Sequence, residues 1–122
     1  MEKTRKFMLL YKRCDMSKLV LYKNKDKVFE KEGTINNNHL KVENITFNLE
    51  NNILTREDDN FKYELDFINE NALVLIKEKN YTLNLLIKTK EITNDNKLIK
   101  IIYNIESDEE SENIIEIIIW YN

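Results

Sequence analysis

The clearest pattern in the chain is an alternation of apolar and polar residues between positions 60 and 89. Its first run, residues 60–67, places four apolar side chains at every second position: Phe61, Tyr63, Leu65 and Phe67. A period of two gives one dry face and one wet face only in an extended strand. Two further apolar runs, at 72–76 and 81–89, follow after short polar turns. The stretch therefore predicts three antiparallel strands joined as a meander.

Similar runs lie before and after this meander. They occupy residues 4–12, 17–23, 27–31, 53–56, 98–106 and 113–121. Residues 39–50 form either two short strands or one long bent strand. Residues 90–92 extend the strand before them, although 90–97 is also the one place where a turn of helix fits. The pattern predicts an all-β protein of about eight to ten strands.

The turns are unusual because the chain has no proline and a single glycine, Gly33. Asparagine tolerates the left-handed conformation, so the asparagines at the predicted turns can replace glycine there. We expect a two-residue hairpin turn at Asn51 and Asn52. Gly33 follows a short strand, which predicts a β-bulge or a positive φ angle at this position.

The number of strands favours a closed sheet, because long open sheets curl or split into two layers. The segment from Ile114 to Tyr121 is apolar on both faces and would template aggregation as a free edge. Pairing it with the N-terminal strand removes that edge. Short sequential hairpins favour up-and-down connections. We therefore expect residues 1–122 to form a single antiparallel up-and-down, lipocalin-like β-barrel domain. A two-layer sandwich has the same periodicity.

Composition narrows the class of protein. The chain is 42% hydrophobic and 34% charged, which suits a β-protein with a well-solvated outer face. Its one cysteine, Cys14, excludes an intrachain disulfide and is compatible with a reducing compartment. The apolar run at residues 7–11 is too short for a signal peptide or a membrane helix. We expect a cytoplasmic protein without a membrane segment, from an AT-rich, bacterial genome.

Parts of the sequence resemble a known family. These are residues 54–56, 63–67, 81–92 and 101–105, together with the pair Glu32 and Gly33. The chain from about residue 28 to the C-terminus is similar to the YwiB-type family of uncharacterised bacterial proteins. The resemblance implies a lipocalin-like (calycin) barrel and no established activity.

Catalytic and metal-binding motifs are not apparent in the sequence. His39 is the one histidine and has no partners at ligand spacing. There is no glycine-rich phosphate loop and no nucleophile motif, so we predict no catalytic residue, metal or cofactor. Residues 1–31 hold ten Lys and Arg against four Asp and Glu. They lack the aromatic and glycine signature of a nucleic-acid module, so we do not expect nucleic acid as a partner.

A ligand site is predicted from one arginine and several aromatic residues. Arg56 can receive a carboxylate or phosphate in bidentate fashion, or pair with an acidic neighbour at positions 57–59. The tyrosines either line a pocket or pack in the core. The candidate ligand-binding residues are Arg56, Tyr63, Tyr81, Thr89 and Tyr103.

Two functions follow from these predictions. The first is a non-enzymatic barrel that binds a small apolar or anionic ligand, since a barrel of about eight strands has room for one small molecule. The alternative is a filled barrel that works through protein–protein contact, as a homodimer along the edge from Ile114 to Tyr121. The sequence does not show whether the interior is filled or hollow.

Overall fold

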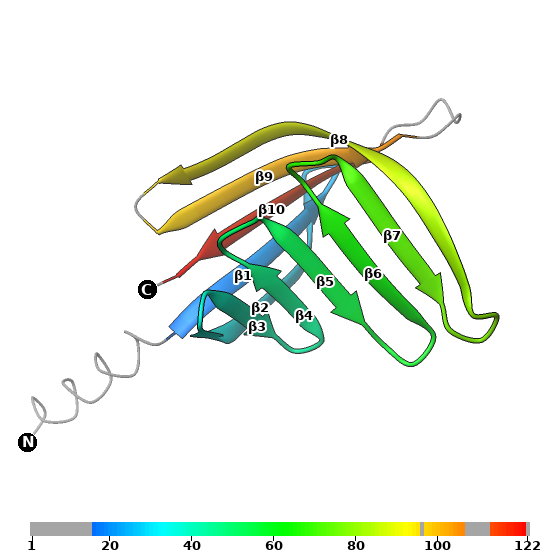
Figure 1. Ribbon diagram of the computed structural model, residues 1–122. Coiled ribbons are helices and arrows are strands. Elements are labelled where there is room, and N and C mark those ends of the chain that lie inside the picture. The colour runs from blue at the N-terminus through cyan, green and yellow to red at the C-terminus, as the bar shows by residue number, and fades with distance from the viewer. Residues whose placement is uncertain (1–15, 96, 107–112, 122) are drawn as a thin grey trace, which may run out of the picture.

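The computed structural model describes residues 16–95, 97–106 and 113–121, which form one closed antiparallel barrel (Figure 1). Each strand pairs with the next along the chain, and the last pairs with the first. The strands are β1 (Met16–Lys23), β2 (Asp26–Asn36), β3 (His39–Val42), β4 (Ile45–Asn48), β5 (Ile53–Glu57), β6 (Phe61–Asp66), β7 (Asn71–Ile76), β8 (Tyr81–Asp95), β9 (Leu98–Ile105) and β10 (Ile114–Trp120). The predicted all-β, up-and-down barrel is confirmed, and its closure decides against a sandwich.

Several strand boundaries differ from the predicted ones. The strand expected at 4–12, Cys14 and most of the acidic turn after Glu106 lie outside the described residues. Residues 39–50 form two strands, β3 and β4, and β2 continues to Asn36 instead of ending near residue 31. The described part of 90–97 contains no helix. Within the described residues, no helix is long and apolar enough to cross a membrane.

Two hairpins, β1–β2 and β2–β3, have two-residue turns with a positive φ at both positions. Asn24 and Lys25 connect β1 to β2 with φ angles of 50° and 73°, and Asn37 and Asn38 connect β2 to β3 with 51° and 63°. A two-residue turn with positive φ at both positions matches the right-handed twist of the flanking strands. The predicted use of asparagine in place of glycine is confirmed.

The expected two-residue turn at Asn51 and Asn52 is wrong. The connection between β4 and β5 spans four residues, and only Asn52 of the two has a positive φ, 55°. The reason is a side chain at the end of β4. The Asn48 Oδ1 accepts a hydrogen bond from the Glu50 backbone N–H at 2.9 Å, and the Asn48 carbonyl accepts one from the Asn52 N–H at 2.9 Å. These bonds begin the turn earlier than the sequence indicates.

The long strand β8 pairs with β7 along its first part, residues 81–86, and with β9 along its second part, residues 87–95. The register with β9 shifts between Thr89 and Glu91, which marks a bulge at Lys90. A bulge bends its strand and increases the local twist. β8 accordingly arches over the top of the barrel from the β6–β7 side to the β9–β10 side (Figure 1).

Gly33 does not have the predicted role. Its φ is not positive, and the irregularity between β1 and β2 falls between Leu21 and Tyr22, opposite Val28. The structure shows a different reason for glycine. A Cβ at this position would overlap the backbone carbonyl oxygen of Lys41 and the Cγ2 of Val42. Glycine is therefore required by close packing of β2 on β3, and not by its conformational freedom.

Most of the barrel interior is filled by buried side chains, which are aliphatic except for Phe47, Phe67 and Tyr103. Phe47 and Phe67 are 0% and 1% exposed. The other core members that are less than 2% exposed are Leu19, Leu40, Val42, Ile45, Ala72, Ile99, Ile101, Ile117 and Ile119. Their alternation with exposed residues along each strand is the pattern from which the strands were predicted.

Glu30 carries the most perturbed carboxylate of the described outer face. It pairs with Lys18 on β1 and with Lys27 on its own strand, whose Nζ lies 2.6 Å from Oε1. Hydrogen bonds from Lys18 and then Lys27 lower the pKa of Glu30 from 4.5 to about 2. Since the charged form is favoured in the folded state, this stabilisation is present above the unfolded pKa and disappears as the pH falls through the folded pKa.

We therefore expect Glu30→Gln to lower the melting temperature at pH 7, and the difference from wild type to shrink as the pH falls from 4.5 towards 2. Thermal unfolding of both proteins across this pH range measures the effect. In a Lys18→Met background the same substitution should have a smaller effect, because the first-ranked partner of the carboxylate is gone. A melting-temperature difference that stays constant across this range would contradict the prediction.

Candidate ligand-binding site

A cavity of about 440 Å³ opens at one end of the barrel. Its lining residues are Leu21, Ile45, Leu54, Arg56, Asp58, Tyr63, Leu65, Tyr103, Ile105 and Ile117. Ile45 and Ile117 are each 1% exposed and belong to the barrel core, whereas Arg56 and Asp58 are exposed. The cavity thus has an apolar floor and a charged rim that is open to solvent. Its volume lies within the ~300–1,000 Å³ range of small-molecule sites.

The strand register directs the central residues of the site into the barrel. Arg56 on β5 lies opposite Ile45 on β4 and opposite Tyr63 on β6. Directly opposed residues of an antiparallel pair share a face of the sheet. Because Ile45 is buried in the core, Arg56 and Tyr63 are also on the inner face. The Tyr63 ring stacks on Phe61 with centroids 5.9 Å apart, which extends the apolar wall towards the rim.

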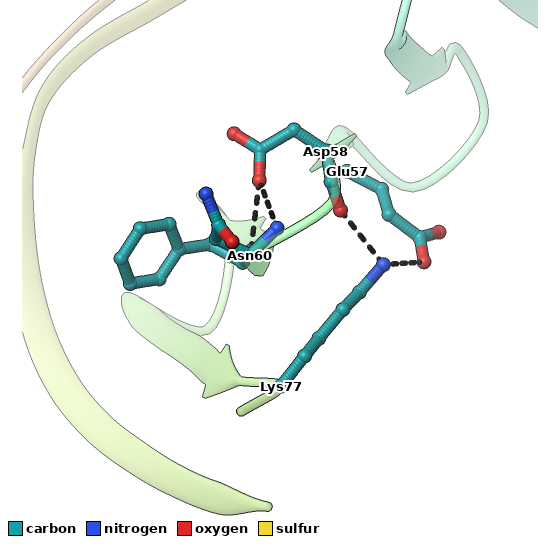
Figure 2. Close-up of polar contacts among 5 residues, drawn as sticks. Glu57, Asp58, Asn60 and Lys77 are labelled. Atoms are coloured by element: carbon teal, nitrogen blue, oxygen red, sulfur yellow. Dashed lines mark hydrogen bonds and ion pairs between the residues drawn. The ribbon is translucent and has the colours of Figure 1, made fainter. Parts of the chain in front are cut away.

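The turn between β5 and β6 is held in place by Lys77. Its Nζ lies 2.7 Å from the Glu57 Oε2 and donates a 2.7 Å hydrogen bond to the Asp58 carbonyl oxygen (Figure 2). The Lys77 backbone N–H also donates to the Asn60 carbonyl oxygen at 2.9 Å. These contacts hold the β5–β6 turn against the end of β7. The Arg56 side chain takes no part in them.

Asp58 uses one carboxylate oxygen to shape the same turn. Its Oδ1 accepts hydrogen bonds from the backbone N–H groups of Asn60 and Phe61, each at 2.8 Å (Figure 2). The N–H of Phe61, followed by that of Asn60, lowers the pKa of Asp58, so the side chain is a carboxylate at neutral pH. Its second oxygen, Oδ2, makes no hydrogen bond or ion pair with any described residue.

The Arg56 side chain has no hydrogen bond or ion pair within the described part of the chain. The sequence left open a pairing of Arg56 with Glu57, Asp58 or Asp59. In the structure Glu57 is paired with Lys77, and Asp58 feels the Arg56 charge only as a minor contribution to its lowered pKa. The guanidinium of Arg56 is therefore available to a ligand at the cavity rim.

Tyr103 adds a neutral polar group to the cavity wall. The residue is 7% exposed, and its ring packs on Phe67 with centroids 4.9 Å apart. Burial raises the pKa of the Tyr103 hydroxyl to about 12, so it stays protonated at neutral pH. Among the described residues this hydroxyl has no hydrogen-bond partner. A buried tyrosine hydroxyl usually finds one, which makes Tyr103 a free donor in the cavity wall.

The structure brings together three of the five candidate residues. Arg56, Tyr63 and Tyr103 line one cavity, whereas Tyr81 and Thr89 do not. Tyr81 is 54% exposed at the start of β8, because it lies on the part of the strand that extends past β9. The Thr89 Oγ1 donates to the Phe67 carbonyl oxygen at 2.8 Å, and its N–H donates to the Glu70 Oε2 at 2.9 Å. Thr89 therefore anchors the β6–β7 turn.

Sequence reasoning did not include Asp58, Ile105 or the aliphatic lining residues Leu21, Ile45, Leu54, Leu65 and Ile117. Asp58 was taken as one of three acidic residues in a turn, and charge alone does not distinguish it from Glu57 or Asp59. The Asp-x-Asn-Phe order is the one local signal that distinguishes Asp58. It is typical of an Asx turn, in which the side chain of the first residue accepts hydrogen bonds from the backbone two and three residues later. Ile105 lies two positions after Tyr103 on β9, so the alternation of the strand already placed it on the same face, at the end of the strand.

The predicted homodimer edge from Ile114 to Tyr121 is not a free edge. β10 pairs with β1 on one side and with β9 on the other. Barrel closure satisfies its backbone groups, as the sequence predicted, so association along this segment would use the outer face of β10. Ile114 and Trp120 remain 37% and 43% exposed on the outer side of the sheet.

The described residues do not form a metal-binding site. No group of three or more His, Cys, Asp or Glu side chains there could hold a metal ion. His39 is exposed, and its Nδ1 lies 2.9 Å from the Asn37 carbonyl oxygen. Comparison with protein-family models, curated proteins and solved structures returned no match.

Proposed function

We propose that this protein is a lipocalin-like, cytoplasmic barrel that binds a small, partly apolar ligand without catalysis. The observation that carries the proposal is the 440 Å³ cavity with an apolar floor and an unpaired Arg56 at its rim. Aliphatic walls with a few polar groups at defined places are typical of small-molecule sites. Membership of the YwiB-type family is part of this proposal, and the barrel fold implied by that family supports it.

Binding without reaction fits the chemistry of the lining side chains. The lowered pKa of Asp58 makes it a weak base, and the raised pKa of Tyr103 makes it a weak acid. General acid–base catalysis is most efficient when the pKa lies near the working pH. The lining contains no Ser, Thr, Cys, Lys or His to serve as a nucleophile. The polar groups of the cavity are thus suited to orient a ligand.

A second candidate function is association through the outer face of β10. It rests on the exposed Ile114 and Trp120. The Lys18 Nζ lies 5.8 Å from the Trp120 ring centroid, so this aromatic face already has a cationic neighbour within the barrel. Native mass spectrometry of protein purified from its own host separates the two functions. A co-purifying small molecule supports ligand binding, and a bare dimer unaffected by ligand mixtures supports association.

The cavity itself is tested by blocking its mouth. Ile105 is 44% exposed at the rim, so Ile105→Trp adds bulk there without displacing the buried core. We expect this variant to bind the fluorescent probe 8-anilinonaphthalene-1-sulfonate at least about tenfold more weakly than wild type, a loss of about 1.4 kcal/mol. Fluorescence titration measures the affinity, and circular dichroism confirms the fold.

The matched control is Ile68→Trp. Ile68 is 58% exposed, follows β6 and does not line the cavity. This variant should bind the probe as wild type does. Equal probe binding by wild type, Ile105→Trp and Ile68→Trp would show that the probe does not enter the cavity, and would overturn the proposed site.

A further inference from the structure

We infer that the ligand is a zwitterion with an apolar body, whose carboxylate binds Arg56 and whose ammonium group binds Asp58. This inference rests on the proposed function and names the chemical class of its ligand. An α-amino acid with a long aliphatic side chain has this chemistry. The apolar body would lie on the cavity floor, against residues such as Leu54, Leu65 and Ile117.

The first step of the argument is that two opposite charges share one rim and are not paired with each other. Arg56 and Asp58 both line the cavity. The structure gives Arg56 no ion pair among described residues, and it leaves the Asp58 Oδ2 without a contact there. Each therefore keeps a free side of its charged group. A guanidinium offers a planar fork that matches a carboxylate, and a carboxylate oxygen accepts from an ammonium group.

The second step is that Arg56 and Asp58 are the two charged side chains among the described residues that line the cavity. They are one positive and one negative charge without ion-pair partners among the described lining residues. A simple anion on Arg56 would lie beside the Asp58 carboxylate and be repelled by it. A zwitterion satisfies both groups and adds no net charge.

The third step is that Asp58 is held in one place. Its Oδ1 is fixed by two backbone N–H groups, and its backbone carbonyl is fixed by Lys77 (Figure 2). A carboxylate positioned in this way loses little side-chain entropy when a ligand binds. Arg56 lies on β5 and Asp58 lies in the turn that follows, so the ligand carboxylate is placed on the β5 side and the ligand ammonium group on the side of the turn.

Four ten-carbon probes separate the possible head groups: 2-aminodecanoate, decanoate, decylamine and decanol. Isothermal titration calorimetry at pH 7 gives their affinities for the wild-type protein. We expect 2-aminodecanoate to bind at least about threefold more tightly than each of the others, within the range of exposed charge pairs. If decanoate or decanol binds as tightly as 2-aminodecanoate, the zwitterion inference is overturned.

Two charge-removing variants should shift the preference in opposite directions. Asp58→Asn keeps an oxygen for the turn and removes the charge, so decanoate should become the preferred probe. Arg56→Gln should instead make decylamine the preferred probe. Lys41→Gln removes a charge from the outer face of β3 and should leave the wild-type order unchanged, since Lys41 does not line the cavity. An unchanged order in Asp58→Asn and Arg56→Gln would also overturn the inference.

Failure of the proposed function gives a different result. In that case none of the four probes would bind to wild type, and 8-anilinonaphthalene-1-sulfonate would bind equally to wild type and Ile105→Trp. Binding of the probes without a head-group preference would leave the cavity in place and remove only the assignment of its ligand.

Discussion

Replacing Phe67 with alanine is expected to lower the free energy of unfolding by about 3–5 kcal/mol. Phe67 follows β6, is 1% exposed and packs on Tyr103 in the centre of the barrel. Its removal would leave a void lined by side chains from several strands. A closed barrel cannot collapse around this void, because each strand is fixed to two neighbours by backbone hydrogen bonds. The loss is a large part of the ~5–15 kcal/mol typical of a domain.

Urea unfolding followed by circular dichroism measures this loss. The control is Ile68→Ala at the adjacent position, which is 58% exposed and should change stability by less than about 0.5 kcal/mol. A loss below about 1 kcal/mol for Phe67→Ala would show that the ring is not a central part of the core. Phe67→Leu should fall between the two, because it restores part of the buried volume.

The second large effect is expected at Gly33, where alanine should destabilise the protein by about 1–3 kcal/mol. The sign of this change is informative. In a strand with negative φ, Gly→Ala ordinarily stabilises by about 0.4–1 kcal/mol, because it restricts the unfolded chain. Here the added Cβ would overlap the Lys41 carbonyl oxygen, which is backbone and cannot rotate away. β2 and β3 would have to separate and weaken their pairing.

The same unfolding measurement tests this prediction. Glu32→Ala is the matched control, since Glu32 is exposed on the same strand and lies opposite Lys18 on β1. It should change stability by less than about 0.5 kcal/mol. Equal or higher stability of Gly33→Ala would mean that β2 and β3 are farther apart at this position than the structure shows.

Local patterns in the sequence were enough to predict the fold class. The alternation in residues 60–67 depends only on which face of a strand each side chain occupies, so the strands of the central meander could be identified without coordinates. The asparagine turns at 24 and 37–38 were predictable for a similar reason. Their positive φ angles are a property of the asparagine backbone and side chain.

The candidate site was only partly predictable. Arg56 stood out because it is a single arginine beside three acidic residues, and Tyr63 because it belongs to an alternating strand. Tyr81 and Thr89 have equally suitable side chains and lie elsewhere. The difference is the way β8 extends beyond β9 and bends at Lys90, which depends on strand register. Asp58 lines the cavity because of its position in the β5–β6 turn, which a hydrogen bond from Lys77, 19 residues later in the chain, holds in place.

The remaining features depend on contacts between residues far apart in the chain. The sequence alone predicted an antiparallel barrel and its turn chemistry, because these follow from side-chain periodicity and backbone preferences within a few residues. It did not show that Gly33 lies against Lys41, or that Arg56 and Tyr103 face one cavity. Those features are set by the register and closure of the sheet, where strands distant in sequence come together. For the same reason only the tertiary structure shows that the inner face is packed over most of the barrel and leaves a cavity of about 440 Å³ beside Arg56 and Tyr103.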